Sequence, residues 1–571
     1  MVNGWSTASA LDCGQPAMLA FCLLQAAFAA TAVRAFGAPP FVASLDAQQQ
    51  LGLGNPAPIL NPEVDAAIER ILADFRTPGG VSVAVLFDVL ATGLLIANAS
   101  LAPRLSWESK LKEVFPGEVW GLQDKFAEGG EHNRGYYEPP LGDAEARSGC
   151  APGERTRIRR LRYLKPSTGF REHWQYNNHM YTVLSYLPPL LTGVPYETYV
   201  EDNIFTPLGM NATTFYSTVA EASGELSEGM TREGANATVD DPYALGTPHA
   251  LPFWLPNDKP GHILSGAGAI VSSAIDMATW LQTLLEDGKH PETGAEVIPA
   301  DAIRRAASGV MVMTGVASFP DLSPIVYGGA QMRGSYRGFE YIEHGGATIG
   351  HRTQITRVPS QMLGVAVLSN DNEYGSQLME AVKFRIIDEA LGLEPVDWAG
   401  RYRNATVKAL AAGPPPSTPR RPDASEPMLP VVELEGTYTD AGRCRDAIKD
   451  APRRLPDVLD PDADAPTLLA LWPMIFGYSH VKLEHFEGGV FNLTVLASFK
   501  NLDRATNTTR PFWASPLVAP GVRAEFAYHP RTGKVGFGVE GGFWGEGAGV
   551  PPPSEEGKDV VERAEVWFER V

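Results

Sequence analysis

Metal-binding and cofactor-binding motifs are missing from this chain of 571 residues. No HExxH or CxxC spacing occurs, so a metal enzyme has no support in the sequence. The Gly-x-Ser-x-Gly elbow of α/β-hydrolases is absent as well. One glycine run, at 545–549, lacks the strand, helix and final glycine of a dinucleotide-binding loop, and we interpret it as a turn. The sequence therefore predicts neither a resident metal nor a cofactor.

Positive charge is scarce relative to negative charge. The chain has 47 Lys and Arg against 67 Asp and Glu, which gives a net charge of −20. Phosphate backbones and anionic membranes repel such a chain at long range. A basic cluster occurs at 155–165, but Ile158 and Leu161 within it are spaced for one face of a helix, which favours a solvated amphipathic segment. We expect no nucleic-acid partner.

Long hydrophobic runs are also scarce, and the main one lies near the N-terminus. Residues 17–33 are apolar, a length that is short for a membrane span and close to the core of a secretory signal. The residues before this run contain no Lys or Arg and do contain Asp12. We predict that 1–37 is a signal peptide, with an uncleaved membrane anchor as the alternative. The protein is then expected to be secreted, and to touch a membrane only if this segment stays attached.

Six Asn-x-Ser/Thr sequons fit a secreted glycoprotein, although such motifs also arise by chance. They begin at Asn98, Asn211, Asn236, Asn404, Asn492 and Asn507. The chain has only four cysteines, and removal of the leader would leave Cys150 and Cys444. In an oxidising compartment these two could form one disulfide, or they could be unrelated free thiols. The sequence leaves both possibilities open.

The length predicts more than one domain. Asn61-Pro62 begins an amphipathic helix that ends before Thr77, since Asn suits the N-cap and Pro the first turn. A β-type run at 81–85 leads directly into a buried helix at 86–98, and 128–154 is an irregular loop.

Farther along the chain, helices are predicted first and strands later. The predicted helices cover 180–187 and 196–205, with a break at Pro188-Pro189, and a third helix capped by Ser272 and Ser273 runs to about Glu286. Strand-like runs at 339–343, 352–358 and 364–368 predict a meander, followed by a helix at 377–391. The pattern predicts an α+β fold, because strands and helices do not alternate as in βαβ units.

The C-terminal part has a different composition. Residues 396–430 are predicted to be a linker, which is proline-rich from Ala411 onward and therefore semi-rigid. Beyond it, 431–571 has short apolar runs separated by turn residues, which predicts a small antiparallel β domain, similar to a barrel.

Two short motifs stand at predicted element boundaries. Tyr176-Asn177-Asn178 precedes a helix, and His344-Gly345-Gly346 ends a strand. Taken singly, such a tyrosine or histidine is most often structural. The sequences around these two motifs are more specific than the motifs alone. The informative stretches are WQYNNHMY, YVEDNIFTPLGMNATTF, SGAGAIVSSAIDMATWLQTLLEDG, YIEHGGATIGHRTQITRVP and GVAVLSND.

These stretches resemble the serine β-lactamase and penicillin-binding-protein superfamily, in particular the class C β-lactamase-related hydrolases, which include D-aminopeptidases, carboxypeptidases and esterases. The resemblance covers roughly 60–395. The C-terminal domain looks like the lipocalin-like β appendage of some fungal-type members. The resemblance implies a β-lactamase/transpeptidase-like α+β domain, an antiparallel sheet flanked by helices, followed by a C-terminal antiparallel β-barrel-like domain.

The resemblance also implies roles for individual residues. Tyr176 would take the proton of a nucleophilic serine, Asn178 would hold the amide or ester group of the substrate, and His344, Gly345 and Gly346 would line the pocket from the strand side. A free phenol titrates near 10, so such a base needs a nearby cation, usually the lysine of a Ser-x-x-Lys motif. The implied partner is a small-molecule or peptide-like amide or ester.

The nucleophile is not found in this sequence. In relatives a Ser-x-x-Lys segment stands between the first strand and a helix that begins like Leu86, but here Val85 is followed at once by Leu86. Two formal matches remain, Ser109 to Lys112 and Ser479 to Lys482, and neither has the context of the motif. A second departure from the family pattern is the stretch 129–154, which is rich in residues that break helices and strands. It replaces the segment that relatives carry before the position of Tyr176.

Two explanations fit these departures: a degenerate homologue, or a gene model with a skipped exon and misread introns. We therefore consider two hypotheses for the function. One is a secreted serine hydrolase that works by acyl transfer, and the other is a catalytically dead protein that binds a ligand in the same pocket. Because acyl-enzyme chemistry needs a nucleophile beside its base, inactivity is favoured for the chain as given.

Overall fold

The computed structural model describes residues 61–78, 88–101, 105–117, 119–120, 158, 161–163, 174–251, 253, 257–262, 264–413, 420–439, 466–471, 480–503, 508–517, 522–541 and 559–571. Several predicted features lie outside these residues. They are the leader at 1–37, the strand at 81–85 with the junction to Leu86, the loop at 128–154, Cys150, Cys444 and Ser479.

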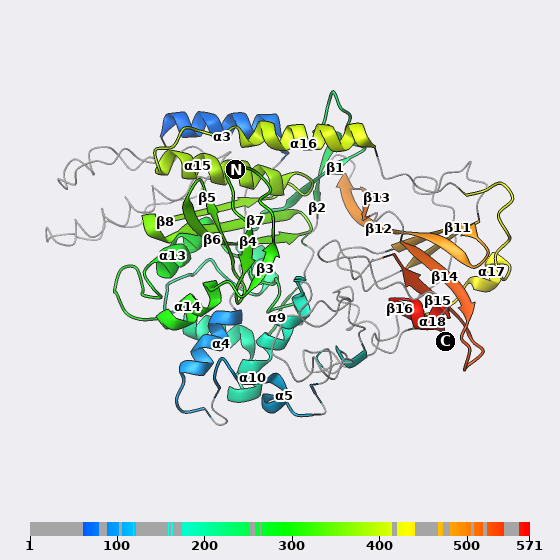
Figure 1. Ribbon diagram of the computed structural model, residues 1–571, viewed down its shortest axis with the longest axis horizontal. Coiled ribbons are helices and arrows are strands. Elements are labelled where there is room, and N and C mark those ends of the chain that lie inside the picture. Colours follow the sequence, from blue (N-terminus) through cyan, green and yellow to red (C-terminus); the bar gives the residue numbers. More distant parts are fainter. Residues whose placement is uncertain are drawn as a thin grey trace, which may run out of the picture.

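A six-stranded antiparallel sheet forms the centre of the larger unit (Figure 1). Its strands follow in chain order: β3 (Met311–Thr314), β4 (Ile325–Tyr327), β5 (Met332–Tyr336), β6 (Phe339–Thr348), β7 (His351–Val358) and β8 (Leu363–Ser369). The predicted meander is confirmed as β6, β7 and β8. Strand β6 is longer than predicted, because its pairing with β7 continues through Gly345 and Gly346 to Thr348.

Three helices cover one face of this sheet: α3 (Pro62–Asp74), α15 (Gly375–Ala390) and α16 (Trp398–Ala412) (Figure 1). Helix α3 begins as the sequence predicts, since the side chain of Asn61 accepts hydrogen bonds from the N–H groups of Glu63 and Val64. The sequence predicts a linker at 396–430, but the first part of this stretch forms helix α16. Trp398 is buried and stacks on Phe384 of α15 with ring centroids 4.4 Å apart, so this apolar anchor keeps the segment folded against the domain.

The other face of the sheet carries the remaining helices of the unit, with α13 (Ala274–Leu285) packed against β7 and β8. Their buried side chains form the largest apolar core. These helices are α4 (Asp88–Ala97), α5 (Leu111–Val114), η1 (Leu161–Tyr163), α9 (Asn178–Ser185), α10 (Leu187–Thr192), α11 (Tyr196–Val200), η2 (Glu201–Phe205), α12 (Ser217–Ala222) and α14 (Ala300–Ala307). The hairpin of β1 (Gly229–Glu233) and β2 (Thr247–Leu251) lies beside the end of β8, where the N–H of Met230 donates to the carbonyl of Asn370.

Two sequence predictions about these helices can be compared with the structure. Ser273 caps α13 as predicted, because its side chain accepts a hydrogen bond from the N–H of Asp276. The predicted break at Pro188-Pro189 is displaced: both prolines lie in the first turn of α10, where a missing N–H leaves no hydrogen bond unmade. The boundary between α9 and α10 lies instead at Tyr186, which is the C-cap of α9 and the N-cap of α10.

The C-terminal unit is a curled antiparallel sheet, a half-barrel with the strand order β10-β11-β12-β14-β15-β16-β9, to which β13 adds beside β12. Its apolar core is rich in phenylalanine, with Phe491, Phe526 and Phe537 in contact. The elements are α17 (Val431–Leu434), β9 (Tyr438–Thr439), β10 (Thr467–Leu471), β11 (His480–Glu487), β12 (Val490–Asp503), β13 (Thr508–Leu517), β14 (Arg523–Tyr528), β15 (Val535–Glu540), α18 (Val560–Arg563) and β16 (Val566–Arg570). The predicted β-rich fold is confirmed, but among the described residues β9 and β10 do not pair to close a barrel.

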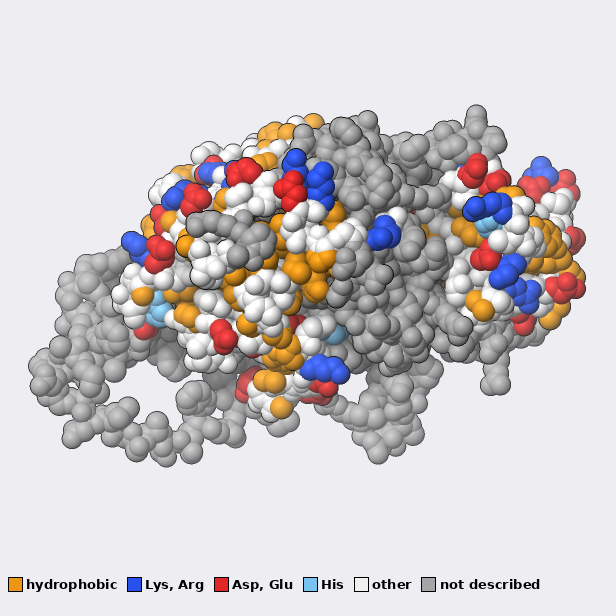
Figure 2. Space-filling model, turned by 90° about the horizontal axis from the view of Figure 1, so that it is seen from below, with side chains coloured by type: hydrophobic (Ala, Val, Ile, Leu, Met, Phe, Trp, Pro, Cys, Tyr) orange, Lys and Arg blue, Asp and Glu red, His pale blue; other side chains and the backbone are white. Residues whose placement is uncertain are grey.

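Charge and apolarity are distributed unevenly on the face drawn in Figure 2. Apolar side chains gather over the middle of the larger unit, and acidic and basic side chains are interspersed around them. Among the described helices, none has both the length and the apolarity required to cross a membrane.

Candidate active site

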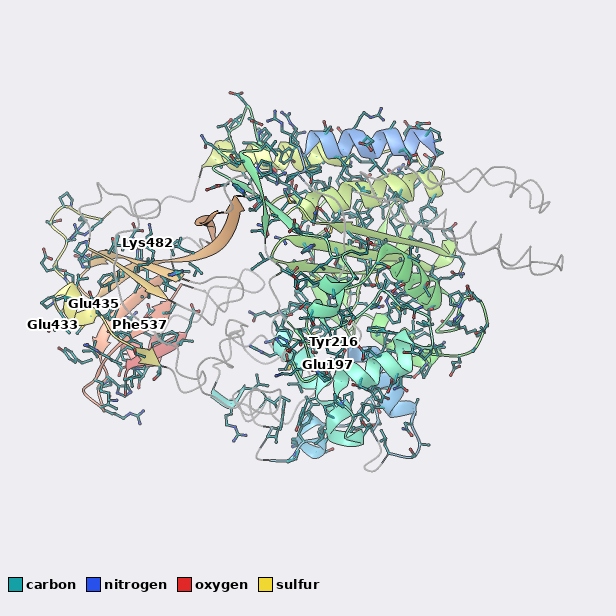
Figure 3. The ribbon with its side chains drawn as sticks, turned by 180° about the vertical axis from the view of Figure 1, so that it is seen from behind. Glu197, Tyr216, Glu433, Glu435, Lys482 and Phe537 are labelled. Atoms are coloured by element: carbon teal, nitrogen blue, oxygen red, sulfur yellow. The ribbon has the colours of Figure 1, made fainter. Side chains whose placement is uncertain are left out.

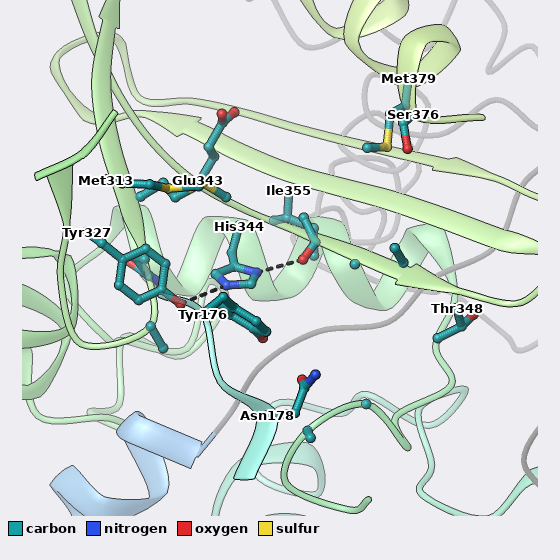
Figure 4. A pocket seen from close by; sticks show the side chains of 18 of the residues that line it. Tyr176, Asn178, Met313, Tyr327, Glu343, His344, Thr348, Ile355, Ser376 and Met379 are labelled. Carbon is teal, nitrogen blue, oxygen red and sulfur yellow. Dashed lines mark hydrogen bonds between the residues drawn. The ribbon is translucent and has the colours of Figure 1, made fainter. Parts of the chain in front are cut away.

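The predicted site residues lie around one cavity. Tyr176, Asn178, His344, Gly345 and Gly346 all line a space of about 400 Å³, shown in Figure 4. The first two come from the start of α9 and the other three from β6, so the cavity lies where the sheet meets the helical region. The structure therefore brings together residues that are far apart in the sequence, while their chemical roles remain a prediction.

The Tyr176-Asn177-Asn178 segment is shaped by a helix cap. The side chain of Asn177 accepts hydrogen bonds from the N–H groups of His179 and Met180, at 2.8 and 3.3 Å. Asn177 is thus the N-cap of α9, and Asn178 is the first residue of the helix. The two flanking residues, Tyr176 and Asn178, are left to face the cavity.

His344 is placed by the register of the sheet. It pairs with Ile355 on β7, and both residues line the cavity. Gly345 pairs with Gln354, and a Cβ added to Gly345 would lie 2.6 Å from the side-chain oxygen of Gln354. A side chain at Gly345 would therefore force Gln354 to move, which gives this glycine a packing reason independent of catalysis.

A chain of hydrogen bonds fixes the state of His344. Its Nδ1 lies 2.7 Å from the carbonyl oxygen of Gly345, and a carbonyl only accepts, so Nδ1 carries the proton. Nε2 then accepts from the hydroxyl of Tyr327 at 3.0 Å, and the hydroxyl of Tyr181 donates to that of Tyr327 in turn. Burial lowers the pKa of His344 to about 4, partly offset by the Gly345 carbonyl. The imidazole is consequently neutral near pH 7.

Tyr327 and Tyr181 also belong to the site. Tyr181 ends the WQYNNHMY stretch but was not assigned a role from the sequence, and no sequence motif pointed to Tyr327. Tyr327 ends the three-residue strand β4, which has too few residues to show a period of its own. Burial raises the pKa of Tyr327, so its hydroxyl keeps its proton near neutrality. Trp174 adds a further ring, with its centroid 5.2 Å from that of Tyr327.

The comparisons with known proteins find a family domain in part of the chain. A model of the β-lactamase family matches residues 129–384. This part of the chain is therefore a β-lactamase-family domain.

Among curated proteins, the unguisins hydrolase ungD of Aspergillus violaceofuscus is 27% identical over 387 residues, which cover 63% of this chain and 65% of that protein. The unguisins hydrolase ungD' of Aspergillus campestris is 29% identical over 49% of this chain and 50% of that protein. The chain thus spans less than two thirds of the length of these curated relatives.

Two solved structures are also similar to this chain. The octameric penicillin-binding protein homologue from Pyrococcus abyssi is 16% identical, with a TM-score of 0.43, over 83% of this chain and 97% of that chain. The class C β-lactamase from Rhodobacter sphaeroides is 18% identical, with a TM-score of 0.41, over 58% of this chain and 100% of that chain.

A family nucleophile is not found among the described residues of this β-lactamase relative. Ser109 lies in the loop before α5, where its hydroxyl accepts a hydrogen bond from the N–H of Ser106, and it does not line the cavity. Lys482 lies on β11 of the C-terminal sheet, 3.0 Å from Glu484 (Figure 3). Of the described residues that line the cavity, none is a lysine.

The described residues also offer no conventional metal centre. They contain no group of three or more His, Cys, Asp or Glu side chains arranged to hold an ion. The polar groups that do line the cavity include the phenols of Tyr176 and Tyr327, the amide of Asn178 and the imidazole of His344. This set of donors and acceptors, beside the aromatic ring of Trp174, can orient the carbonyl group of an uncharged amide or ester.

Proposed function

We propose that this protein binds an amide or ester ligand in the cavity between β6 and α9, and that the chain as given does not turn the ligand over. The observation that supports binding is the meeting of Tyr176, Asn178 and His344 at one cavity of about 400 Å³. Such a concave site with aromatic walls and a few polar groups is typical of small-molecule binding.

The lack of turnover follows from the chemistry of the family. Acyl transfer requires a nucleophile within hydrogen-bond reach of a base. Of the two Ser-x-x-Lys matches, Ser109 precedes α5, Lys112 lies within α5 and Lys482 lies on β11, and none of these three residues lines the cavity. We therefore propose that the pocket retains the binding groups of a hydrolase without its attacking hydroxyl.

Binding is tested with N-benzoylglycinamide, a neutral amide with an aromatic ring, by calorimetry on the full chain. We expect measurable binding that the Asn178→Leu variant weakens about fivefold or more, because one hydrogen bond to the carbonyl is lost. The matched control is Asn236→Leu, on an exposed loop, which should bind as the parent does. Equal binding by the Asn178 variant and the parent would overturn the proposed role of this cavity.

Turnover is tested separately. The full chain is incubated with a chromogenic β-lactam and with p-nitrophenyl esters, and its intact mass is measured after treatment with a fluorophosphonate. We expect neither saturable turnover nor a mass increase at a serine. Saturable turnover together with a labelled serine would contradict the proposal of inactivity.

A second candidate function is hydrolysis by acyl transfer to a serine. It is supported by the two fungal relatives, which are named as hydrolases of unguisins. The decisive measurement is the transcript between the codons for Val85 and Leu86. An in-frame insert that encodes Ser-x-x-Lys would restore the family nucleophile and make the active enzyme the better conclusion.

We also propose that the protein is secreted and glycosylated. The asparagines of five sequons, at Asn98, Asn211, Asn236, Asn404 and Asn492, are exposed, so a transferase could reach them. Expression in a fungal host should release the protein into the medium with a mass that falls after glycosidase treatment. Retention of an unmodified protein inside the cells would contradict this localisation.

A further inference from the structure

A turn at 264–268 forms part of the cavity wall on the side of the helices. Its residues Ala267 and Gly268 line the same space as Tyr176. The N–H groups of Ala267 and Gly268 both donate to the carbonyl of Leu264, at 3.0 and 2.9 Å, so the residues of the turn are held to one another. The groups that keep the turn in its place therefore decide the shape of this wall.

On one side the turn packs directly against α9. A Cβ added to Gly266 would lie 2.6 Å from the carbonyl oxygen of Tyr181 and 2.8 Å from the Cβ of Ser185. Only hydrogen fits there, so the backbone of the turn lies against the helix. Tyr181 also bonds the hydroxyl of Tyr327 in the cavity. The turn and the hydrogen-bonded tyrosines thus meet at the same residue of α9.

On the other side the turn is held by Glu197 of α11. The side chain of Glu197 is fully buried, and its Oε1 accepts from the N–H groups of Gly261 at 2.9 Å and His262 at 3.2 Å. The hydroxyl of Ser265, within the turn, donates to the same oxygen. Glu197 does not itself line the cavity, so its influence on the cavity passes through the turn.

The carboxylate of Glu197 in turn depends on these three donors. Among the described residues, its Oε2 has no hydrogen-bond partner. Burial raises the pKa of Glu201 and the charge of Glu197 raises it further, so the two carboxylates repel each other. Burial and the same two carboxylates also raise the pKa of Tyr216, which lies beside Glu197 (Figure 3). Because a buried carboxylate is unfavourable without donors, displacement of the turn is strongly disfavoured.

We propose that Glu197 is a positioning residue for ligand binding: by holding the 264–268 turn against α9, it fixes the helical wall of the cavity and thereby the affinity for an amide or ester ligand. Glu197 does not touch the ligand. This inference rests on the proposed function, because it takes the ligand to lie in the same cavity. It extends the determinants of binding to a buried residue of α11.

The first test follows hydrogen exchange of the unmodified full chain, with and without N-benzoylglycinamide. We expect peptides that contain the 264–268 turn to exchange about threefold more slowly, or slower still, when the ligand is bound, because the ligand then rests on this wall. Peptides from α3, on the other face of the sheet, are the reference and should exchange at the same rate in both samples. Unchanged exchange of the turn in a protein that binds the ligand would overturn the inference.

The second test compares variants by calorimetry with the same ligand, at a temperature at which circular dichroism shows each variant to be folded. Glu197→Leu removes the acceptor of three donors and should weaken the affinity about fivefold or more. Glu197→Gln keeps one acceptor oxygen and should stay within about twofold of the parent. A purely structural role would lower the fraction of molecules that bind and leave the Kd of the folded molecules unchanged.

The matched control removes another fully buried carboxylate of the same domain. Asp388 of α15 accepts from the hydroxyl of Tyr336 at 2.8 Å and from the N–H of Val396 at 3.0 Å, and it does not line the cavity. Asp388→Leu should lower the stability but keep the affinity within about twofold of the parent. An equal loss of affinity in Glu197→Leu and Asp388→Leu would be a general effect of destabilisation and would overturn the role of Glu197.

The measurements separate this inference from the proposed function. If the unmodified protein does not bind N-benzoylglycinamide, the proposed function fails, and the role of Glu197 fails with it. If the unmodified protein and Glu197→Leu bind equally well, the cavity is a binding site and only the role of Glu197 is wrong. Hydrogen exchange of the unmodified chain gives a decision even where a variant does not fold.

Discussion

The hydroxyl of Tyr327 lies 3.0 Å from Nε2 of His344, and this contact joins the end of β4 to the middle of β6. Because Nδ1 of the same ring donates to the carbonyl of Gly345, Nε2 must accept, and the imidazole is held in one neutral tautomer. A protonated ring would place an N–H where Tyr327 now donates. The neutral state of His344 therefore depends on the packing that holds Tyr327 beside it in the cavity wall.

This arrangement predicts a pH dependence of stability. The pKa of His344 is lowered by burial from its ordinary value of 6.5 to about 4, so between these values the unfolded chain binds more protons than the folded chain. The contribution of His344 to the free energy of unfolding is complete above about pH 6.5 and is lost as the pH falls toward 4.

Urea unfolding of the parent and of His344→Gln at pH 7.5 and 5.0 checks this sign. We expect the parent to lose about 1–2 kcal/mol more than the variant between the two pH values. A variant that loses as much stability as the parent would show that His344 titrates normally.

A second prediction concerns a buried ion cluster on the opposite face of β6. Lys383 of α15, 1% exposed in its side chain, lies 3.0 Å from a carboxylate oxygen of Glu343 and 2.7 Å from one of Glu380. The hydroxyl of Thr356 also donates to Glu343, at 2.7 Å. Lys383→Met would leave the buried carboxylate of Glu343 and the partly buried carboxylate of Glu380 without a cation.

We expect Lys383→Met to lower the free energy of unfolding by about 3–5 kcal/mol, measured by urea unfolding at pH 7.5. Adding Glu343→Gln and Glu380→Gln should recover a large part of the loss, since the uncompensated charges are then removed. The control Lys408→Met, at an exposed position of α16, should stay within about 0.5 kcal/mol of the parent. A cost below about 1 kcal/mol for Lys383→Met would contradict the ion-cluster account.

A third prediction tests the close approach of α4 and α14. A Cβ added to Gly93 would lie 2.4 Å from the Cβ of Ala302, so the two helices meet at a point where only hydrogen fits. We expect Gly93→Ala to cost about 1–3 kcal/mol through overpacking, although alanine favours helices. Gly117→Ala is the control, because no heavy atom lies within 4 Å of its added Cβ. Stabilisation by Gly93→Ala would show that the helices are farther apart.

A fourth prediction concerns the cap of α3. Asn61 accepts hydrogen bonds from the N–H groups of Glu63 and Val64, and its amide donates to Glu389 of α15 at 2.6 Å. Asn61→Ala should lower the free energy of unfolding by about 1 kcal/mol, whereas Asn61→Ser, which still caps, should lose less. Thermal unfolding checks the ranking, and equal stability of the two variants would remove capping as the cause.

Local patterns in the sequence were sufficient for several elements. The helix that begins at Asn61, the cap at Ser273 and the strands β6 to β8 follow from capping chemistry and from the alternation of apolar residues. Helix α16 was missed because the proline-rich stretch after it dominated the composition, while its anchor, Trp398, is a single residue whose partners lie elsewhere in the chain.

Local residue order was enough to identify the family motifs and the candidate residues Tyr176, Asn178 and His344. The three-dimensional structure was needed to show that Tyr181 and Tyr327 hold His344 in its neutral form and that Arg357 lines the same cavity. Hydrogen bonds and burial depend on sheet register and on distances between elements, and neither quantity is encoded in the spacing of residues along one segment.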